Sequence, residues 1–196
     1  MKTLTIIGDV HGNFYEYQKI TDSCERSICV GDFGFKKEWD WHLEHIDNSK
    51  HTINMGNHDY LPYLDCGSSL GDFSHDSELG LVTIRGAWSI DKIYRTEGIS
   101  WFENEEISYQ DGLFYFDEYS RIKPKIVISH DCPNSIRQTF FGITEKSNTS
   151  NLLQAMFEVH QPELWIFGHH HKHRDSEILG TRFICLEELE TFEIEI

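Results

Sequence analysis

The sequence predicts an α/β fold whose parallel strands end at one common edge. Five short apolar runs indicate strands, and segments with helical spacing separate most of them. Each run is followed directly by a short stretch that pairs glycine or serine with Asp, Asn or His. The carboxyl ends of parallel strands line up in such a sheet, so the loops that follow them converge on one crevice. We therefore expect these polar side chains to meet at one site.

The first half of the chain alternates between predicted strands and helices. Apolar runs at residues 4–7, 28–30 and 52–55 indicate three strands, and apolar residues at helical spacing in 13–24 and 39–46 indicate a helix in each interval. This βαβαβ order predicts parallel strands joined by right-handed crossovers.

The second half is less regular. Residues 79–88 indicate an antiparallel strand followed by a loop, and the aromatic-rich segment 109–119 indicates a helix. The alternation then resumes with strands at 126–128 and 164–167 and a helix at 150–160. Residues 182–186 and 191–196 predict a closing hairpin. Because no repeat, low-complexity tract or linker interrupts the 196 residues, we expect 1–196 to form a single domain.

Composition favours a cytoplasmic protein. Hydrophobic residues make up 39% of the chain, and no apolar run approaches the roughly 20 residues that cross a bilayer. Asp9 interrupts the first apolar run before it reaches the length of a signal peptide's apolar segment. The five cysteines show no CxxC spacing, which favours reduced structural thiols.

The chain is strongly acidic, with a formal net charge of -16 at pH 7. A field of this sign repels an anionic membrane surface and the phosphate backbone of long nucleic acids. Two bound divalent cations would offset about four of these charges.

The stretches after the strands carry residue types that bind metal ions. Carboxylate, amide and imidazole groups without thiolates are typical ligands of Mn²⁺, Fe or Zn²⁺. Residues two apart on an extended strand share one side, so we expect Asp9 to pair with His11, and His169 with His171, while His170 points away. The stretches are Gly8-Asp9-Val10-His11, Gly31-Asp32, Gly56-Asn57-His58-Asp59, Ser129-His130-Asp131 and Gly168-His169-His170-His171.

These stretches, in this order, resemble the motifs of the calcineurin-like metallophosphoesterase superfamily. Its pattern is D-x-H, G-D, G-N-H-D/E, a lone His and G-H-x-H, and all five elements occur between residues 8 and 171. The resemblance implies a four-layer α/β/β/α sandwich with two mixed β-sheets and a metal site at the carboxyl ends of the strands.

The resemblance also implies a centre of two divalent metal ions. We expect Mn²⁺ at this centre, with Fe or Zn²⁺ as alternatives. Asp32 would bridge the ions and share a hydroxide between them, and His58 would be the catalytic residue beside the leaving-group oxygen. One ion would be held by Asp9, His11, Asp32 and His171, and the other by Asp32, Asn57, His130 and His169.

One position departs from many relatives. They carry a second Asp three residues after the bridging one, sometimes followed by Arg; in protein Ser/Thr phosphatases this Asp orients the catalytic His and the Arg grips phosphate. Phe35 occupies that place here. The metal ligands are unaffected, but what orients His58 stays open, and membership of the protein Ser/Thr phosphatases is disfavoured.

Four further residues are candidates for contacts around the centre. Asp59 is expected to hydrogen-bond backbone or a ligand histidine, and Asp131 to support a ligand or cap a helix. Arg137 and His173 are candidates for contact with substrate phosphate, with ordinary loop positions as the alternative.

The predicted function is hydrolysis of a phosphomonoester of a small molecule or a phosphoprotein by a metal-bridging hydroxide. One alternative is a phosphodiesterase acting on cyclic or short nucleotides. Another is a scaffold that keeps the fold without catalysis, which the complete set of motif residues disfavours. The sequence gives no indication of the oligomeric state.

Overall fold

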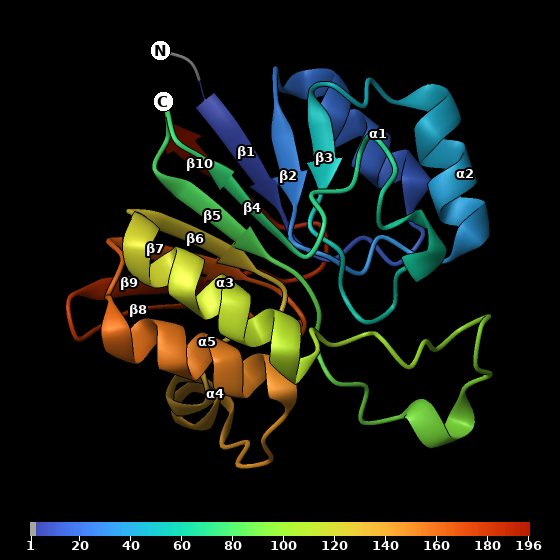
Figure 1. The fold of residues 1–196 in the computed structure, drawn as a ribbon. Helices are drawn as coiled ribbons and strands as arrows, with labels where there is room; N and C mark the ends of the chain where they lie inside the picture. The colour runs from blue at the N-terminus through green and yellow to red at the C-terminus, as the bar shows by residue number, and fades with distance from the viewer. Residues whose placement is uncertain (1–2) are drawn as a thin grey trace.

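The computed structural model describes residues 3–196, which form two β-sheets packed face to face with helices on both outer faces (Figure 1). The smaller sheet has four strands in the order β10-β1-β2-β3, and the larger has six in the order β4-β5-β6-β7-β9-β8. Both sheets contain parallel and antiparallel pairs. The predicted four-layer sandwich with two mixed sheets is confirmed.

The smaller sheet has three parallel strands and one antiparallel edge strand, β10, which pairs with β1. The parallel pairing confirms the βαβαβ interpretation of the first half. The strands are β1 (Thr3–Ile7), β2 (Ser27–Cys29), β3 (His51–Ile53) and β10 (Thr191–Glu195), and the helices between them are α1 (Phe14–Ser23) and α2 (Lys36–His45).

The larger sheet has four parallel strands between two antiparallel edge strands. Its strands are β4 (Phe73–Asp76), β5 (Leu81–Ile84), β6 (Ile126–Ser129), β7 (Leu164–Phe167), β8 (Arg174–Ile178) and β9 (Thr181–Cys185). The helices of this half are α3 (Tyr109–Ile122), α4 (Asn134–Phe141) and α5 (Asn148–Val159); short 3₁₀ turns are η1 (Leu61–Tyr63) and η2 (Lys92–Tyr94). Among the residues described, no helix is long and apolar enough to cross a membrane.

The core consists of three apolar layers, because successive residues of a strand point to opposite faces of its sheet. In β1, Ile6 packs between the two sheets and Ile7 packs toward α1 and α2. On the far side, Trp165 of β7 packs with Tyr119 of α3 and Leu153 of α5. These layers hold the carboxyl ends of the parallel strands of both sheets against each other.

The predicted closing hairpin is wrong. β9 lies between β7 and β8 in the larger sheet, whereas β10 pairs with β1 in the smaller one. The intervening residues cross between the sheets, where the Leu189 amide donates to the Asp9 carbonyl and the Gly8 amide donates to the Glu190 carbonyl. Strands that are close in sequence, such as β9 and β10, often pair with each other. Here β10 pairs with β1 instead. The elements α4, β4 and β8 were not predicted.

Candidate metal centre

All seven residues predicted as metal ligands lie on loops that follow β1, β2, β3, β6 and β7. Six of their side chains form two groups in which the potential ligand atoms lie within 4.8 Å of one another, and Asp32 belongs to both. One group is Asp9, His11, Asp32 and His171, and the other is Asp32, His130 and His169. The structure thus brings together the residues expected from the sequence, while their roles as ligands stay a prediction.

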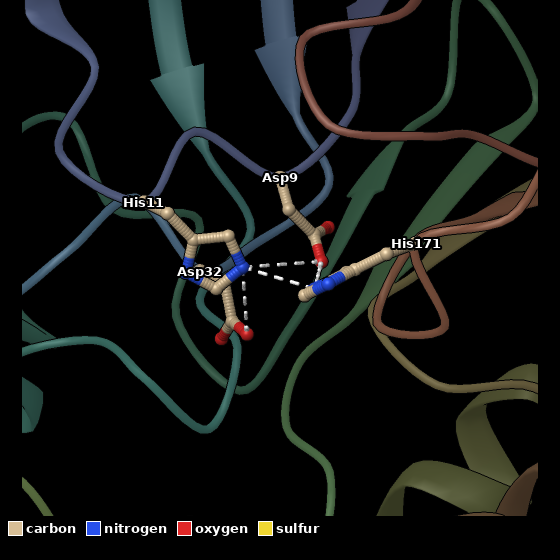
Figure 2. Close-up of side chains that lie close together, drawn as sticks. All are labelled: Asp9, His11, Asp32 and His171. Atoms are coloured by element: carbon tan, nitrogen blue, oxygen red, sulfur yellow. Dashed lines mark hydrogen bonds and ion pairs between the residues drawn. The ribbon is translucent and has the colours of Figure 1, made fainter.

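In the first group, nitrogen and oxygen atoms turn toward one point (Figure 2). The Nε2 atom of His171 lies 3.0 Å from Nε2 of His11 and 3.1 Å from Oδ2 of Asp9. The Nε2 atom of His11 lies 3.9 Å from Oδ2 of both Asp9 and Asp32. Two imidazoles and two carboxylates arranged in this way are a suitable donor set for a divalent cation.

The second group centres on His130, whose side chain is fully buried. Its Nε2 atom lies 3.2 Å from Oδ1 of Asp32 and 3.1 Å from Oδ1 of Asn57, and its ring centroid lies 5.1 Å from that of His169.

A buried hydrogen-bond chain orients the Asn57 amide. Its nitrogen donates to Oγ of Ser89 over 2.9 Å, and that hydroxyl donates to the Glu105 carboxylate over 2.5 Å. The amide oxygen is therefore directed toward His130. Sequence reasoning missed Ser89 and Glu105, because no local pattern connects them to Asn57.

The backbone of four predicted ligands is left-handed. The φ angles are 45° at His11, 50° at Asp32, 65° at His169 and 49° at His171, and these are four of the seven non-glycine residues with positive φ in the described part of the chain. Each such residue costs on the order of 1–3 kcal/mol. Conformations of this cost persist where surrounding contacts impose them, and they cluster at functional sites.

These angles correct the expectation from the two-residue spacing. Asp9, His11 and the two outer histidines of Gly168-His169-His170-His171 follow the strands and are not part of them. Left-handed turns, not strand alternation, direct the side chains of His11, His169 and His171. His170 stacks on Phe141 with ring centroids 4.1 Å apart and places Nε2 3.3 Å from Oδ1 of Asp131.

Glycine is required where the loops approach each other most closely. A Cβ at Gly31, where φ is 138°, would overlap the ring of His130, and a Cβ at Gly168 would overlap the carboxylate of Asp9. These two glycines let the ligand-bearing loops of the two sheets meet.

His130 and Asp32 shift each other's pKa in the buried centre. Burial disfavours the charged form of His130, but the neighbouring carboxylates of Asp32, Asp9 and Asp59 raise its pKa to about 10. Burial also disfavours ionised Asp32, yet His130, His58 and His11 hold its pKa well below the usual value. Burial lowers the pKa of His169 to about 3, which leaves its ring neutral with a free lone pair. Ionised carboxylates beside a neutral imidazole fit a bound divalent cation, which would take the place of the His130 proton.

Asp59 contacts backbone and a tryptophan, not a ligand histidine. It accepts hydrogen bonds from the amides of Gly34 (3.0 Å) and Gly56 (2.6 Å) and from Nε1 of Trp39 (3.1 Å). Burial and the nearby charge of Asp32 raise the pKa of Asp59 to about 7. Asp59 therefore ties together the two loops that carry Asp32 and Asn57.

Asp131 forms a second buried polar cluster beside the centre. It accepts a hydrogen bond from the Cys132 amide over 2.7 Å and pairs with Nη1 of Arg137 over 3.1 Å. Arg137 also lines the pocket described below, whereas His173 pairs with Oε1 of Glu190 at 2.7 Å.

A pocket of about 360 Å³ lies against the centre. One wall comes from the segment between β5 and α3, and another from α4 and the loop after it. The lining residues are Asp32, Asn57, His58, Trp88, Ile90, Asp91, Arg137, Ile143, Glu145, His169, His170 and His171.

His58 lies between the centre and this pocket. Its amide donates to Oδ1 of Asp32 over 2.7 Å, and its ring Nδ1 lies 3.5 Å from Oδ2 of the same carboxylate. Burial lowers the pKa of His58. Phe35 places its ring centroid 6.5 Å from that of His58, so the position that often carries an orienting Asp is apolar here.

Comparisons with known proteins agree with this geometry. A family profile described as calcineurin-like phosphoesterase (Metallophos) matches residues 2–173. None of the curated proteins compared matches the chain.

The chain is also similar to several solved structures. Phosphopantetheinyl hydrolase (PptH) from Mycobacterium tuberculosis is 15% identical with a TM-score of 0.57, over 95% of this chain and 90% of that one. A putative 5′-nucleotidase from Staphylococcus aureus in complex with alpha-ketoglutarate is 15% identical with a TM-score of 0.51, over 97% of this chain and 50% of that one. Vps29 from Entamoeba histolytica, complexed with Zn²⁺, is 13% identical with a TM-score of 0.39, over 95% of this chain and 74% of that one.

Proposed function

Because the chain belongs to the calcineurin-like phosphoesterase family, we propose that it is a metal-dependent hydrolase of a phosphomonoester, carried by a small molecule or a phosphoprotein. Family membership supports hydrolase activity and binding of divalent metal. The two-ion centre, the choice of Mn²⁺, the substrate class, a single domain over 1–196 and a cytoplasmic location are parts of the proposal.

One observation carries the proposal: Asp32 belongs to both groups of potential ligands and also accepts a hydrogen bond from the backbone amide of His58. A carboxylate has two oxygens, so one side chain can serve two cations. The same residue therefore connects both candidate ion sites with the candidate catalytic histidine.

The residues of each group would hold one ion, with Asn57 adding an amide oxygen to the second. When bound, two such ions polarise the phosphoryl oxygens and supply a hydroxide nucleophile near neutral pH. The pocket beside them gives the phosphoester a place to bind within reach of His58.

His58 would supply the proton that the departing group needs. When the bond between phosphorus and the ester oxygen breaks, His58 in its protonated form would give its proton to that oxygen, and the attacking hydroxide would take the place of the ester oxygen on phosphorus. The products would be an alcohol, inorganic phosphate and neutral His58. A positioned acid of this kind contributes about 10²–10⁴-fold.

The direct test measures hydrolysis of p-nitrophenyl phosphate and bis-p-nitrophenyl phosphate by metal-stripped protein, with and without Mn²⁺. Metal content per chain is measured in parallel, and Ca²⁺ serves as the control cation because it prefers an all-oxygen site. We expect Mn²⁺ to restore turnover, with the monoester hydrolysed faster.

Three results would contradict the proposal in different ways. Faster turnover of the diester would favour the phosphodiesterase alternative. Bound metal without turnover of either ester would favour a scaffold. Full activity of metal-stripped protein would exclude metal-dependent hydrolysis.

A further inference from the structure

The segment between β5 and α3 approaches both ring nitrogens of His58. We propose that Asp91 and Arg95, both on this segment, position the imidazole ring of His58 for proton transfer to the leaving group. The inference rests on the proposed function. Phe35 has no polar group with which to orient His58. The inference therefore assigns this task to residues in a different part of the chain.

The two ring nitrogens of His58 have different neighbours. Nε2 lies 3.9 Å from Oδ1 of Asp91, and Nδ1 lies 3.5 Å from both Nη2 of Arg95 and Oδ2 of Asp32. The ring is therefore held between the metal centre and the Asp91–Arg95 pair. The distance to Asp91 exceeds that of a hydrogen bond, and catalytic hydrogen bonds are often this long before substrate binds.

Asp91 is itself fixed by Arg95. The guanidinium donates two hydrogen bonds to the carboxylate, from Nε to Oδ1 over 2.7 Å and from Nη2 to Oδ2 over 2.6 Å. Because this contact is bidentate, it sets the orientation of the carboxylate plane. Arg95 also donates from Nη1 to the Ser100 carbonyl over 3.3 Å.

The local backbone makes this pairing possible. The 3₁₀ turn η2 separates the two residues, with the Tyr94 amide donating to the Asp91 carbonyl and the Arg95 amide donating to the Lys92 carbonyl. The turn lies on the green segment that extends from the sandwich in Figure 1. Asp91 and Arg95 thus form one preorganised unit, and Asp91 also lines the pocket.

The neighbouring alternatives do not fill this role. Both carboxylate oxygens of Asp59 are used by Gly34, Trp39 and Gly56. The carboxylate of Asp32 lies on the Nδ1 side of the His58 ring, toward the metal centre. Asp91 therefore supplies the carboxylate at Nε2.

The test compares Asp91→Asn with Glu97→Gln, a charge-matched change at an exposed position of the same segment. We expect Asp91→Asn to lower kcat by about 10- to 100-fold, with KM and metal content unchanged. The loss should be larger for an alkyl phosphate than for p-nitrophenyl phosphate, since p-nitrophenolate leaves readily without a proton. Glu97→Gln should match the wild type.

Arg95→Gln and a double variant test the connection between the residues. Arg95→Gln should reproduce most of the loss, because it releases Asp91. In the His58→Ala background, Asp91→Asn should cause no further loss, since residues that act through one another are not additive. Additive losses would overturn the proposal.

A readout without turnover separates this inference from the proposed function. In Zn²⁺-loaded protein, Asp91→Asn should shift the ring ¹⁵N resonances of His58, while Glu97→Gln should leave them unchanged. Unshifted His58 resonances would overturn the positioning role even if the enzyme is active. If the wild-type protein is inactive but Asp91→Asn still shifts the His58 resonances, the proposed function is overturned, whereas the contact between Asp91 and His58 is established.

Discussion

The Nε2 atoms of His11 and His171 lie 3.0 Å apart, although 160 positions separate the two residues along the chain. Each follows a strand of a different sheet, β1 in the smaller and β7 in the larger. The packing of the two sheets brings these loops together, and the amide of His169 donates to Oδ2 of Asp9 over 3.0 Å at the junction. The candidate centre is thus a contact between sheets, which ties its geometry to the packing of the whole fold.

Replacing Asp32 should remove most of the metal-dependent chemistry. Asp32→Ala takes a carboxylate from both ligand groups. We expect bound metal to fall to one ion per chain or fewer and kcat/KM to fall more than about 100-fold, since a two-ion site supplies several kcal/mol. Metal analysis and steady-state kinetics measure both. A variant that keeps two ions and normal turnover would refute the shared role of Asp32.

Replacing His58 should separate binding from catalysis. Its ring lies beside Asp32 but outside both ligand groups. His58→Ala is expected to retain wild-type metal content and to lose about 10²–10⁴-fold in kcat, the range for a positioned proton donor. Unaltered kcat would remove His58 from the mechanism.

A methyl group at Gly168 should destabilise the junction between the sheets. The Cβ of Gly168→Ala would overlap the carboxylate of Asp9, so the loops must move apart. We expect a loss of about 1–3 kcal/mol in the free energy of unfolding, measured with urea. Gly67→Ala is the control, because no atom lies within 4 Å of a Cβ at Gly67. Equal stability of the two variants would contradict the close approach.

The buried ring of His42 should make the protein sensitive to acid. Burial lowers the pKa of His42 to about 4, whereas the ordinary value is 6.5. The unfolded chain therefore takes up a proton below about pH 6.5 while the folded ring stays neutral, so the stability present above pH 6.5 is lost as pH falls toward 4.

The variant His42→Phe has no titratable group at position 42. We expect the phenylalanine ring to pack among Tyr17, Phe33 and Trp39, the aromatic neighbours of the His42 ring. Between pH 7.5 and 5, urea unfolding should show that wild type loses about 2 kcal/mol more than the variant. Parallel pH profiles for the two proteins would show that the ring is solvated in the folded state.

The sequence by itself determined which residue types follow each strand, and in what order. Alternation and helical spacing are local properties, so they identified β1, α1, α2, α3, β6, α5 and β7 within a few residues. The ligand candidates were recognisable for the same reason, because each motif is contiguous in the chain.

Only the tertiary structure decided how these pieces meet. The edge of β1 pairs with β10, left-handed turns direct His11 and His171, and Glu105 fixes Asn57 through Ser89. Asp91 reaches His58 across 33 positions, from a segment whose sequence carries no motif. Strand pairing, backbone strain and buried hydrogen bonds depend on contacts between distant segments, and no local periodicity contains that information.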